Sequence, residues 1–345
     1  MRSHAALVGF LGTLCAWPRQ TPAQAALPTP VVVSVAAAGS ERVIAFLSAQ
    51  FGADITVEAV ASIGATPPAG PRVFLLWDEW TLARLAGAGA LRSLQQEQVE
   101  VGAPPMDRAQ PFVLPFAREY AVAVTVDVPR GAGPGRTWDE LALDMAFHDR
   151  LGIVVPEVDG SPWLLAMRHR LERGEPSRAG IALWTTLDAR AGRLASTYAS
   201  MIEDLVGGRL AACVGPRDQL GVAVDRSAGR LRLEPLDGPQ RVRFGIAVTA
   251  DASPRAVDLA RRLLESARIR DLAAAAGMVA VDAGPEALAA EVACAWWERF
   301  EHDVRGRGRS TERLAEWLDL VFGVLFLVCL WFVWRTLRNA EPEQA

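Results

Sequence analysis

The stretch VFLLWDEW, residues 73–80, places two carboxylates directly after a run of apolar side chains. Val73 to Trp77 have the character of a buried strand, and Asp78 and Glu79 follow at once. Carboxylates at the carboxyl end of a strand are well placed to bind a cation or a polar ligand, because ligands of open α/β sheets lie at that edge. A core strand that merely carries two acids is the alternative, and periodicity alone leaves both interpretations open.

No catalytic motif accompanies these residues. The sequence has no G-x-S-x-G elbow, no P-loop, and no G-x-G-x-x-G at a strand-to-helix junction. Asp78, Glu79 and Asp159 are suited to a hard cation, but the four histidines have no ligand spacing. We therefore predict no enzyme, no metal site and no cofactor.

The cysteines give no chemical role either. Cys213, Cys294 and Cys329 follow the first 25 residues, and an odd number without a CxxC pair argues against a redox or zinc site. Cys213 and Cys294 could form a disulfide in an oxidising compartment, although we expect buried free thiols.

Composition allows a large folded chain and excludes some partners. The 345 residues are 51% hydrophobic, which is enough for two domains with cores. The net charge is -4, and all basic residues are arginines scattered among a similar number of acids. No basic patch for nucleic acid is predicted.

Both ends of the chain carry targeting patterns. Residues 1–25 combine a basic start, an apolar stretch and an A-x-A site, which predicts a cleaved secretory signal peptide, with an uncleaved anchor as the alternative. Residues 317–337 are uncharged from Leu320 to Trp334 and would span about 31 Å as a helix, the thickness of a bilayer core. We predict one transmembrane helix and a short cytoplasmic tail, residues 338–345.

The flanking charges bear on the orientation of this span. More arginines precede it than follow it, which by itself favours the reverse topology. The signal peptide should start translocation first, so we expect the body of the protein outside the cytoplasm.

Between the ends, strands and helices alternate. Residues 31–39, 55–60 and 72–77 have the pattern of strands, and residues 40–52 form an amphipathic helix with Ser40 as its cap. Such alternation predicts an α/β fold with a mostly parallel sheet covered by helices on both faces.

The order of these motifs resembles that of type 2 periplasmic solute-binding proteins of the iron, thiamine and polyamine group. The matching segments run over roughly residues 30–281 and include RVFLLWDEWTLARLAGAGALRSL, PFAREYAVAVTVDVP, RTWDEL, LGIVVPEVDGSPWLLAM, EDLVGGRLAACVGPRDQ and VRFGIAVTADASPRAVDLARRLLESARIRDLAAAAGMVAV. The resemblance implies two α/β lobes, joined by two crossing strands, that close on a ligand like a hinge. It places lobe 1 at residues 30–126 and 242–284 and lobe 2 at 127–241. The sequence pattern of residues 285–316, beyond the resemblance, predicts a helical connector and hinge.

The resemblance also implies a ligand site made from loops that face the cleft. The lobe 1 candidates are Gly39 and Ser40, at a helix N-terminus that suits an anion, and Trp77 with Asp78. The lobe 2 candidates are Asp159, Ser161, Trp163 and Arg217. The Arg217 guanidinium could clamp a carboxylate or phosphate.

Ferric iron is not an expected ligand. Iron-binding members of the family use two adjacent tyrosines at the place where this chain has VGPRDQLG. Its only tyrosines are Tyr120 and Tyr198, which are far apart in the sequence.

These patterns together predict a membrane-anchored extracytoplasmic solute-binding protein. It would capture a small ligand, for which an anion is one option, and deliver it to an ABC-type importer, whose permease would be its partner. The alternative is a sensor or scaffold whose cleft has degenerated and whose connector helix engages a partner protein. In that helix the residues expected on one face are Leu288, Val292, Ala295, Trp296 and Phe300.

Overall fold

The computed structural model describes most of the body of the protein. The described residues are 29–36, 40–60, 70–94, 111–131, 133–195, 197–281, 288–306, 322, 325–331 and 333–335. The predicted signal peptide, Gly39, residues 307–316 of the predicted connector and hinge, and the predicted cytoplasmic tail lie outside these residues, as does the side chain of Ser40.

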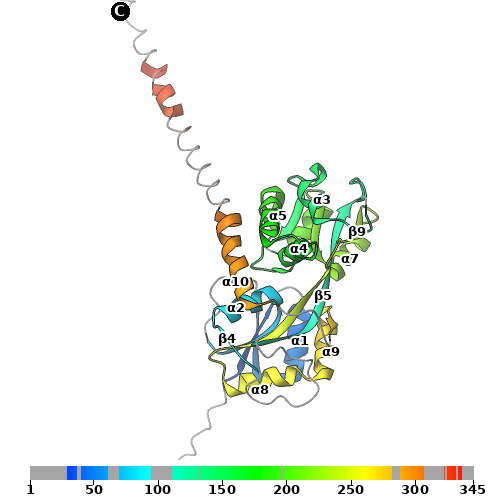
Figure 1. Cartoon of the computed structure of the whole chain (residues 1–345), viewed down its shortest axis with the longest axis vertical. Coiled ribbons are helices and arrows are strands. Elements are labelled where there is room, and N and C mark those ends of the chain that lie inside the picture. The colour runs from blue at the N-terminus through cyan, green and yellow to red at the C-terminus, as the bar shows by residue number, and fades with distance from the viewer. Residues whose placement is uncertain are drawn as a thin grey trace, which may run out of the picture.

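Strands and helices alternate along the described chain, as the sequence predicts (Figure 1). The strands are β1 (Val31–Ala36), β2 (Ile55–Val60), β3 (Arg72–Asp78), β4 (Leu91–Arg92), β5 (Phe112–Thr125), β6 (Leu151–Val154), β7 (Ala191–Ala195), β8 (Ala212–Pro216), β9 (Leu231–Pro235), β10 (Arg241–Thr249) and β11 (Val279–Ala280). The α-helices are α1 (Ser40–Phe51), α2 (Glu79–Gly87), α3 (Trp138–Leu143), α4 (Ser161–Glu172), α5 (Ser177–Arg190), α6 (Tyr198–Val206), α7 (Arg217–Arg226), α8 (Pro254–Leu263), α9 (Ser266–Ala276) and α10 (Ala290–Arg299). Shorter helical turns are η1 (Gly52–Asp54), η2 (Met145–Phe147) and the π-helical η3 (Phe300–Arg305), which continues α10.

One strand, β5, belongs to both halves of the molecule. Its first part pairs antiparallel with β10, and its second part pairs antiparallel with β8 and β9. On the β10 side the order continues through β3 and β1 to β2, and on the β8 side it continues through β6 to β7. We use lobe 1 for the half built on β1 to β3 and β10, and lobe 2 for the half built on β6 to β9 (Figure 1).

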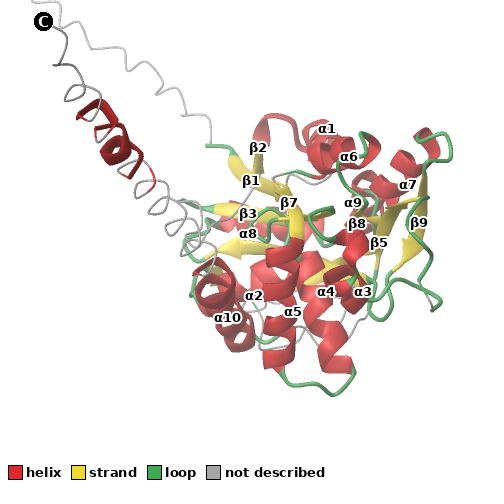
Figure 2. Ribbon diagram, turned by 90° about the horizontal axis from the view of Figure 1, so that it is seen from above, coloured by secondary structure: helices red, strands yellow, loops and turns green. Residues whose placement is uncertain are grey.

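The two lobes have parallel strands at their centres. β1 runs parallel to β2 and β3, and β6 runs parallel to β7 and β8. All seven residues of β3 are buried, which explains its nearly continuous apolar sequence, because a central parallel strand is covered on both faces. In Figure 2 the helices α2, α4, α5 and α10 gather on one side of the strands.

A bulge interrupts β3 close to its end. Leu76 has a φ of 60°, and the pairing with β10 shifts between Gly245 and Ile246. A bulge changes the alternation of side chains along a strand, so Trp77 lies on the same side as Phe74, with ring centroids 6.0 Å apart. Gly245 is required opposite the bulge, because a Cβ there would lie 2.4 Å from the carbonyl oxygen of Val113.

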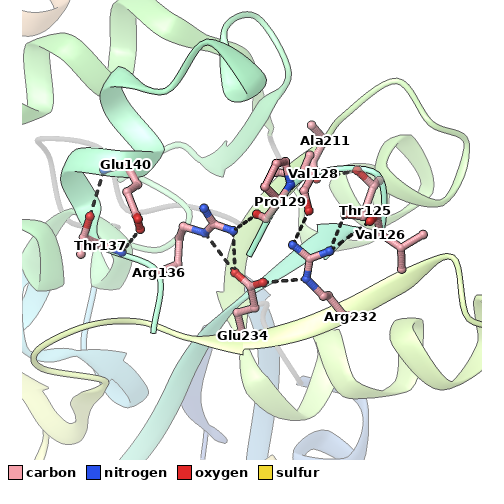
Figure 3. A network of polar contacts seen from close by, with 10 residues as sticks. All are labelled: Thr125, Val126, Val128, Pro129, Arg136, Thr137, Glu140, Ala211, Arg232 and Glu234. Atoms are coloured by element: carbon pink, nitrogen blue, oxygen red, sulfur yellow. Dashed lines mark hydrogen bonds and ion pairs between the residues drawn. The ribbon is translucent and has the colours of Figure 1, made fainter. Parts of the chain in front are cut away.

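A half-buried network of arginines fixes the turn that follows β5 in lobe 2 (Figure 3). The Glu234 carboxylate accepts hydrogen bonds from Arg136 at 3.0 Å and from Arg232 at 2.6 Å. The same guanidinium groups also donate to backbone carbonyls, Arg136 to Pro129 and Arg232 to Val128. Burial alone would raise the pKa of Glu234, but the hydrogen bonds from the two arginines hold this pKa below its usual range. The loop from Pro129 to Arg136 is therefore held against β9.

The cysteines are free thiols in the part of the chain described. Cys213 is fully buried in β8, and Cys294 lies in α10, so the alternative of a disulfide between them is not realised. Burial raises the pKa of the Cys213 thiol to about 12, which keeps it protonated and unreactive.

The predicted transmembrane span is described only in part. Residues 322, 325–331 and 333–335 are helical, and apolar side chains such as Phe326, Leu327 and Trp334 are more than half exposed. Within the described residues, no helix combines the length and the apolar character that crossing a membrane requires.

Candidate functional site

The lobes meet where two helices begin. Asp78 ends β3 in lobe 1 and caps α2, because its carboxylate accepts from the backbone N–H of Thr81 at 3.0 Å and from the Thr81 hydroxyl at 2.7 Å. Asp159 precedes α4 in lobe 2, and its carboxylate accepts from the backbone N–H of Ser161 at 2.9 Å. Each of these local hydrogen bonds fixes a carboxylate at the junction of the lobes.

Both tyrosines of the chain converge on Asp159. The hydroxyl of Tyr120, on the crossing strand β5, donates to Oδ2 of Asp159 at 2.6 Å. The hydroxyl of Tyr198, the first residue of α6, donates to the same oxygen at 2.8 Å. Burial, followed by the charge of Asp159, raises the pKa of each tyrosine well above its ordinary value. Both hydroxyls therefore stay protonated and act as donors.

Asp78 faces this group across the lobe boundary. A Cβ on Gly160 would lie 3.2 Å from Oδ1 of Asp78 and 2.9 Å from the ring of Trp80. Only glycine therefore lets the segment before α4 approach the start of α2 this closely. Burial, and secondly the negative charge of Asp159, raise the pKa of Asp78 to about 6. Neither Asp78 nor Asp159 has an ion pair among the described contacts, and the charge of Arg84 lowers the pKa of Asp78 by less than burial and Asp159 raise it. Negative charge therefore predominates at this part of the junction.

Glu79 forms a second polar contact between the lobes. Its fully buried carboxylate lies 2.9 Å from the guanidinium of Arg168 in α4 and 3.2 Å from that of Arg243 in β10. It also accepts a hydrogen bond from the backbone N–H of Leu288 at 2.7 Å. One side chain thus joins lobe 1, lobe 2 and the chain that leads into α10.

The rest of the junction is filled by aromatic side chains, which we call the aromatic cluster. Its members come from α2, α4, α5, α10 and η3, and they are Trp80, Trp163, Trp184, Trp296, Trp297 and Phe300. Trp80 of lobe 1 and Trp184 of lobe 2 have ring centroids 5.1 Å apart. The lobes are therefore closed on one another, with α10 and η3 covering the seam.

A separate cavity lies on the other side of β5. It has a volume of about 480 Å³ and is bounded by α7 of lobe 2 and by the end of α9 in lobe 1. Arg217 lines this cavity and pairs with Glu119 at 3.2 Å. In Figure 1 these helices lie to the right of β5, whereas α2 and α10 lie to the left.

Comparison with solved structures shows what fold this arrangement represents. No protein-family model matches the sequence, and no curated protein matches it. Apo ferric ion-binding protein A of Pasteurella haemolytica is 15% identical, with a TM-score of 0.57 over 76% of this chain and 88% of that one. The periplasmic binding protein AfuA of Actinobacillus pleuropneumoniae, with fructose-6-phosphate bound, is 11% identical, with a TM-score of 0.59 over 80% of this chain and 98% of that one. This chain has the periplasmic binding protein fold.

Within the periplasmic binding protein fold, only some predicted site residues come together. Asp159 and Ser161 lie at the lobe junction beside Asp78, and Trp163 lies there within the aromatic cluster. Arg217 lines the separate cavity instead, so it is not brought to the same site. Gly39 lies outside the described residues, and Ser40 is the first residue of α1.

The predicted projection of Trp77 toward the cleft is wrong. The indole is 2% exposed, and its N–H donates to the backbone oxygen of Ser34 in the core of lobe 1 at 3.0 Å. The bulge at Leu76 is the physical reason, because it turns Trp77 to the side of Phe74. Sequence reasoning also missed the roles of Tyr120 and Tyr198, which lie at the junction.

No group of three or more histidine, cysteine, aspartate or glutamate side chains in the described part of the chain is arranged to hold a metal ion. Apart from Glu79 and its arginines, the polar groups gathered at the junction are the carboxylates of Asp78 and Asp159, the two tyrosine hydroxyls and the hydroxyl of Ser161, which is fully buried. This set can accept hydrogen bonds or a positive charge from a ligand.

Replacing Trp77 tests its place in the core. We expect Trp77→Ala to lower the free energy of unfolding by about 3–5 kcal/mol, because a fully buried ring is lost. Trp77→Phe keeps a ring but loses the bond to Ser34 and part of the buried indole volume, so it should cost less, about 2 kcal/mol. Urea denaturation measures both, and an alanine variant as stable as the parent would contradict the buried position.

Replacing Asp78 tests the raised pKa. The folded protein binds the Asp78 proton more tightly than the unfolded chain, so this group lowers stability as the pH rises from about 4 to above 6. Asp78→Asn keeps an oxygen for Thr81 but has no charge. Relative to the parent, the variant should therefore gain up to about 3 kcal/mol between pH 4 and pH 8.

Thermal unfolding at several pH values measures this difference. Asp225→Asn, at an exposed position on α7, is the matched control and should show no such gain. An equal difference between Asp78→Asn and the parent at pH 4 and pH 8 would rule out the raised pKa.

Proposed function

We propose that this protein is a solute-binding protein that holds a small ligand between its lobes, with no chemistry of its own. The carrying observation is the polar group at the lobe junction, formed by Asp78, Asp159, Tyr120 and Tyr198. Buried carboxylates that form no ion pair are unfavourable unless a partner compensates them, and a bound ligand is such a partner. The solved structures with this fold, a ferric ion-binding protein and a periplasmic binding protein with fructose-6-phosphate bound, support solute binding in general.

The charge of the site argues for a ligand with a positive charge or with hydrogen-bond donors. An anionic ligand, which the sequence left as one option, would meet two carboxylates and would be repelled. The expected anion-binding groups contribute little here, because Arg217 pairs with Glu119 on the far side of β5. An amine or another cation would instead neutralise Asp78, and the N–H groups of an amine could also donate a hydrogen bond to the Asp159 carboxylate.

A cationic ligand should bind more tightly as the pH rises. It favours ionised Asp78, whose pKa in the free protein is about 6, so affinity should fall by about tenfold for each pH unit below 6 and level off above it. Asp78→Asn should weaken binding by at least about tenfold and remove this pH dependence. Asp225→Asn should change neither.

Thermal-shift screening of the full chain against amines, divalent and ferric ions, and sugar phosphates would find the ligand, and titration calorimetry would give its pH dependence. Binding of a sugar phosphate that Asp78→Asn leaves unaffected would refute the cationic ligand. A protein that melts unchanged with every compound would favour the second candidate, a degenerate cleft that acts through a protein partner. The observation behind this candidate is the aromatic cluster that fills the junction.

We further propose that residues 317–337 anchor the protein in the membrane, with the body outside the cytoplasm and an ABC-type permease as its partner. The support is the uninterrupted apolar sequence, together with the exposed apolar side chains of residues 325–331. Anchoring would raise the concentration of the receptor beside the permease.

The membrane topology can be tested directly. A reporter that is active only in the cytoplasm, fused after Ala345, should be active, because the short tail would lie on that side. The same reporter fused at residue 284, before the connector, should be inactive. The reverse pattern would overturn this topology.

A further inference from the structure

The C-terminal helix is attached to both lobes at once. α10 lies against α2 of lobe 1, and η3 continues it onto α5 of lobe 2 (Figures 1 and 2). Phe300, at the start of η3, is 1% exposed. Its ring centroid lies 6.4 Å from that of Trp80 in lobe 1, and 5.1 Å and 5.6 Å from those of Trp163 and Trp184 in lobe 2.

The attachment of α10 to lobe 1 includes polar contacts along α2. The indole N–H of Trp80 donates to the backbone oxygen of Ala293 at 3.1 Å. The Arg84 guanidinium lies over the ring of Trp297, 4.0 Å from its centroid, which is close enough for a cation–π contact. Together with the bond from Leu288 to Glu79, these contacts root α10 on lobe 1.

The attachment of the C-terminal helix to lobe 2 is concentrated in η3 and in the last turn of α10. Trp296 contacts Trp184 edge to face, with centroids 6.5 Å apart. Arg305, at the end of η3, forms an ion pair with Glu157 in the loop after β6. These contacts and Phe300 are what holds lobe 2 against the helix.

We propose that α10 and η3 form a strap that clamps lobe 2 onto lobe 1, so that the lobe junction opens only when η3 leaves lobe 2. Opening by rotation about the crossing strands would separate Trp80 from Trp184, and Phe300 cannot stay in contact with both. The apolar area released in this way keeps the closed state favoured. The strap controls access to Asp78 and Asp159 whatever ligand they bind, so it does not rest on the proposed function.

Hydroxyl-radical footprinting of the full chain in detergent micelles, without ligand, tests the strap. The reporters are Tyr120 and Tyr198, because they are buried at the junction and none of their described contacts involves α10 or η3. Phe300→Ala should increase the labelling of both tyrosines by at least about tenfold, since it removes the ring shared by the lobes. Arg305→Ala keeps the aromatic cluster and should increase it by about two- to threefold.

The control is Arg299→Ala, which changes an exposed side chain of the same helix and should leave tyrosine labelling unchanged. If Phe300→Ala fails to fold, the Arg305→Ala variant alone decides. Increased labelling of Trp163 and Trp184 with no increase at the tyrosines in either variant would mean that the helix only covers the aromatic cluster, and the strap would be refuted. A ligand that binds with unchanged affinity to Phe300→Ala would leave the proposed function intact while also arguing against the strap.

Discussion

The strand β5 carries backbone pairing for both lobes, and the rest of the molecule is arranged around this constraint. Its 14 residues extend about 46 Å, long enough to leave one sheet and enter the next without a loop. Because β5 forms backbone hydrogen bonds with β10 in lobe 1 and with β8 and β9 in lobe 2, the lobes can rotate about this strand but cannot separate from it. Every other contact between the lobes therefore decides the angle of closure and not whether the halves stay together.

Those other contacts combine two kinds of interaction with opposite consequences. The aromatic cluster is apolar and favours closure simply by excluding water. Glu79 is compensated by Arg168 and Arg243, so its burial fixes the relative position of the lobes at little electrostatic cost. Asp78 forms no ion pair among the described contacts, and burial disfavours its ionised form more than the charge of Arg84 favours it, so ionised Asp78 opposes closure. Closure is thus apolar in origin, and its sensitivity to conditions comes from one carboxylate.

The sequence predicts the alternation of elements well and the direction of single side chains less well. The start of a helix at Glu79 follows from local patterns that the fold does not change. Trp77 was placed wrongly because the bulge at Leu76 arises from pairing with a strand far along the chain, which periodicity cannot reveal. Tyr120 and Tyr198 are far apart in the sequence, and only the folded chain brings their hydroxyls to the same carboxylate. The buried face of α10 also differs from the predicted one, because Trp297 is buried although the sequence pattern does not include it in the apolar face.

The composition of the aromatic cluster also determines the optical properties of the protein. Five of the 11 tryptophans, those in the cluster, lie within contact distance of one another across the seam between the lobes. Indole rings at such separations exchange excitation energy, and their emission depends on whether water reaches them. A large share of the tryptophan fluorescence of this chain therefore originates at the seam. Its emission should change when the lobes open and water reaches the cluster.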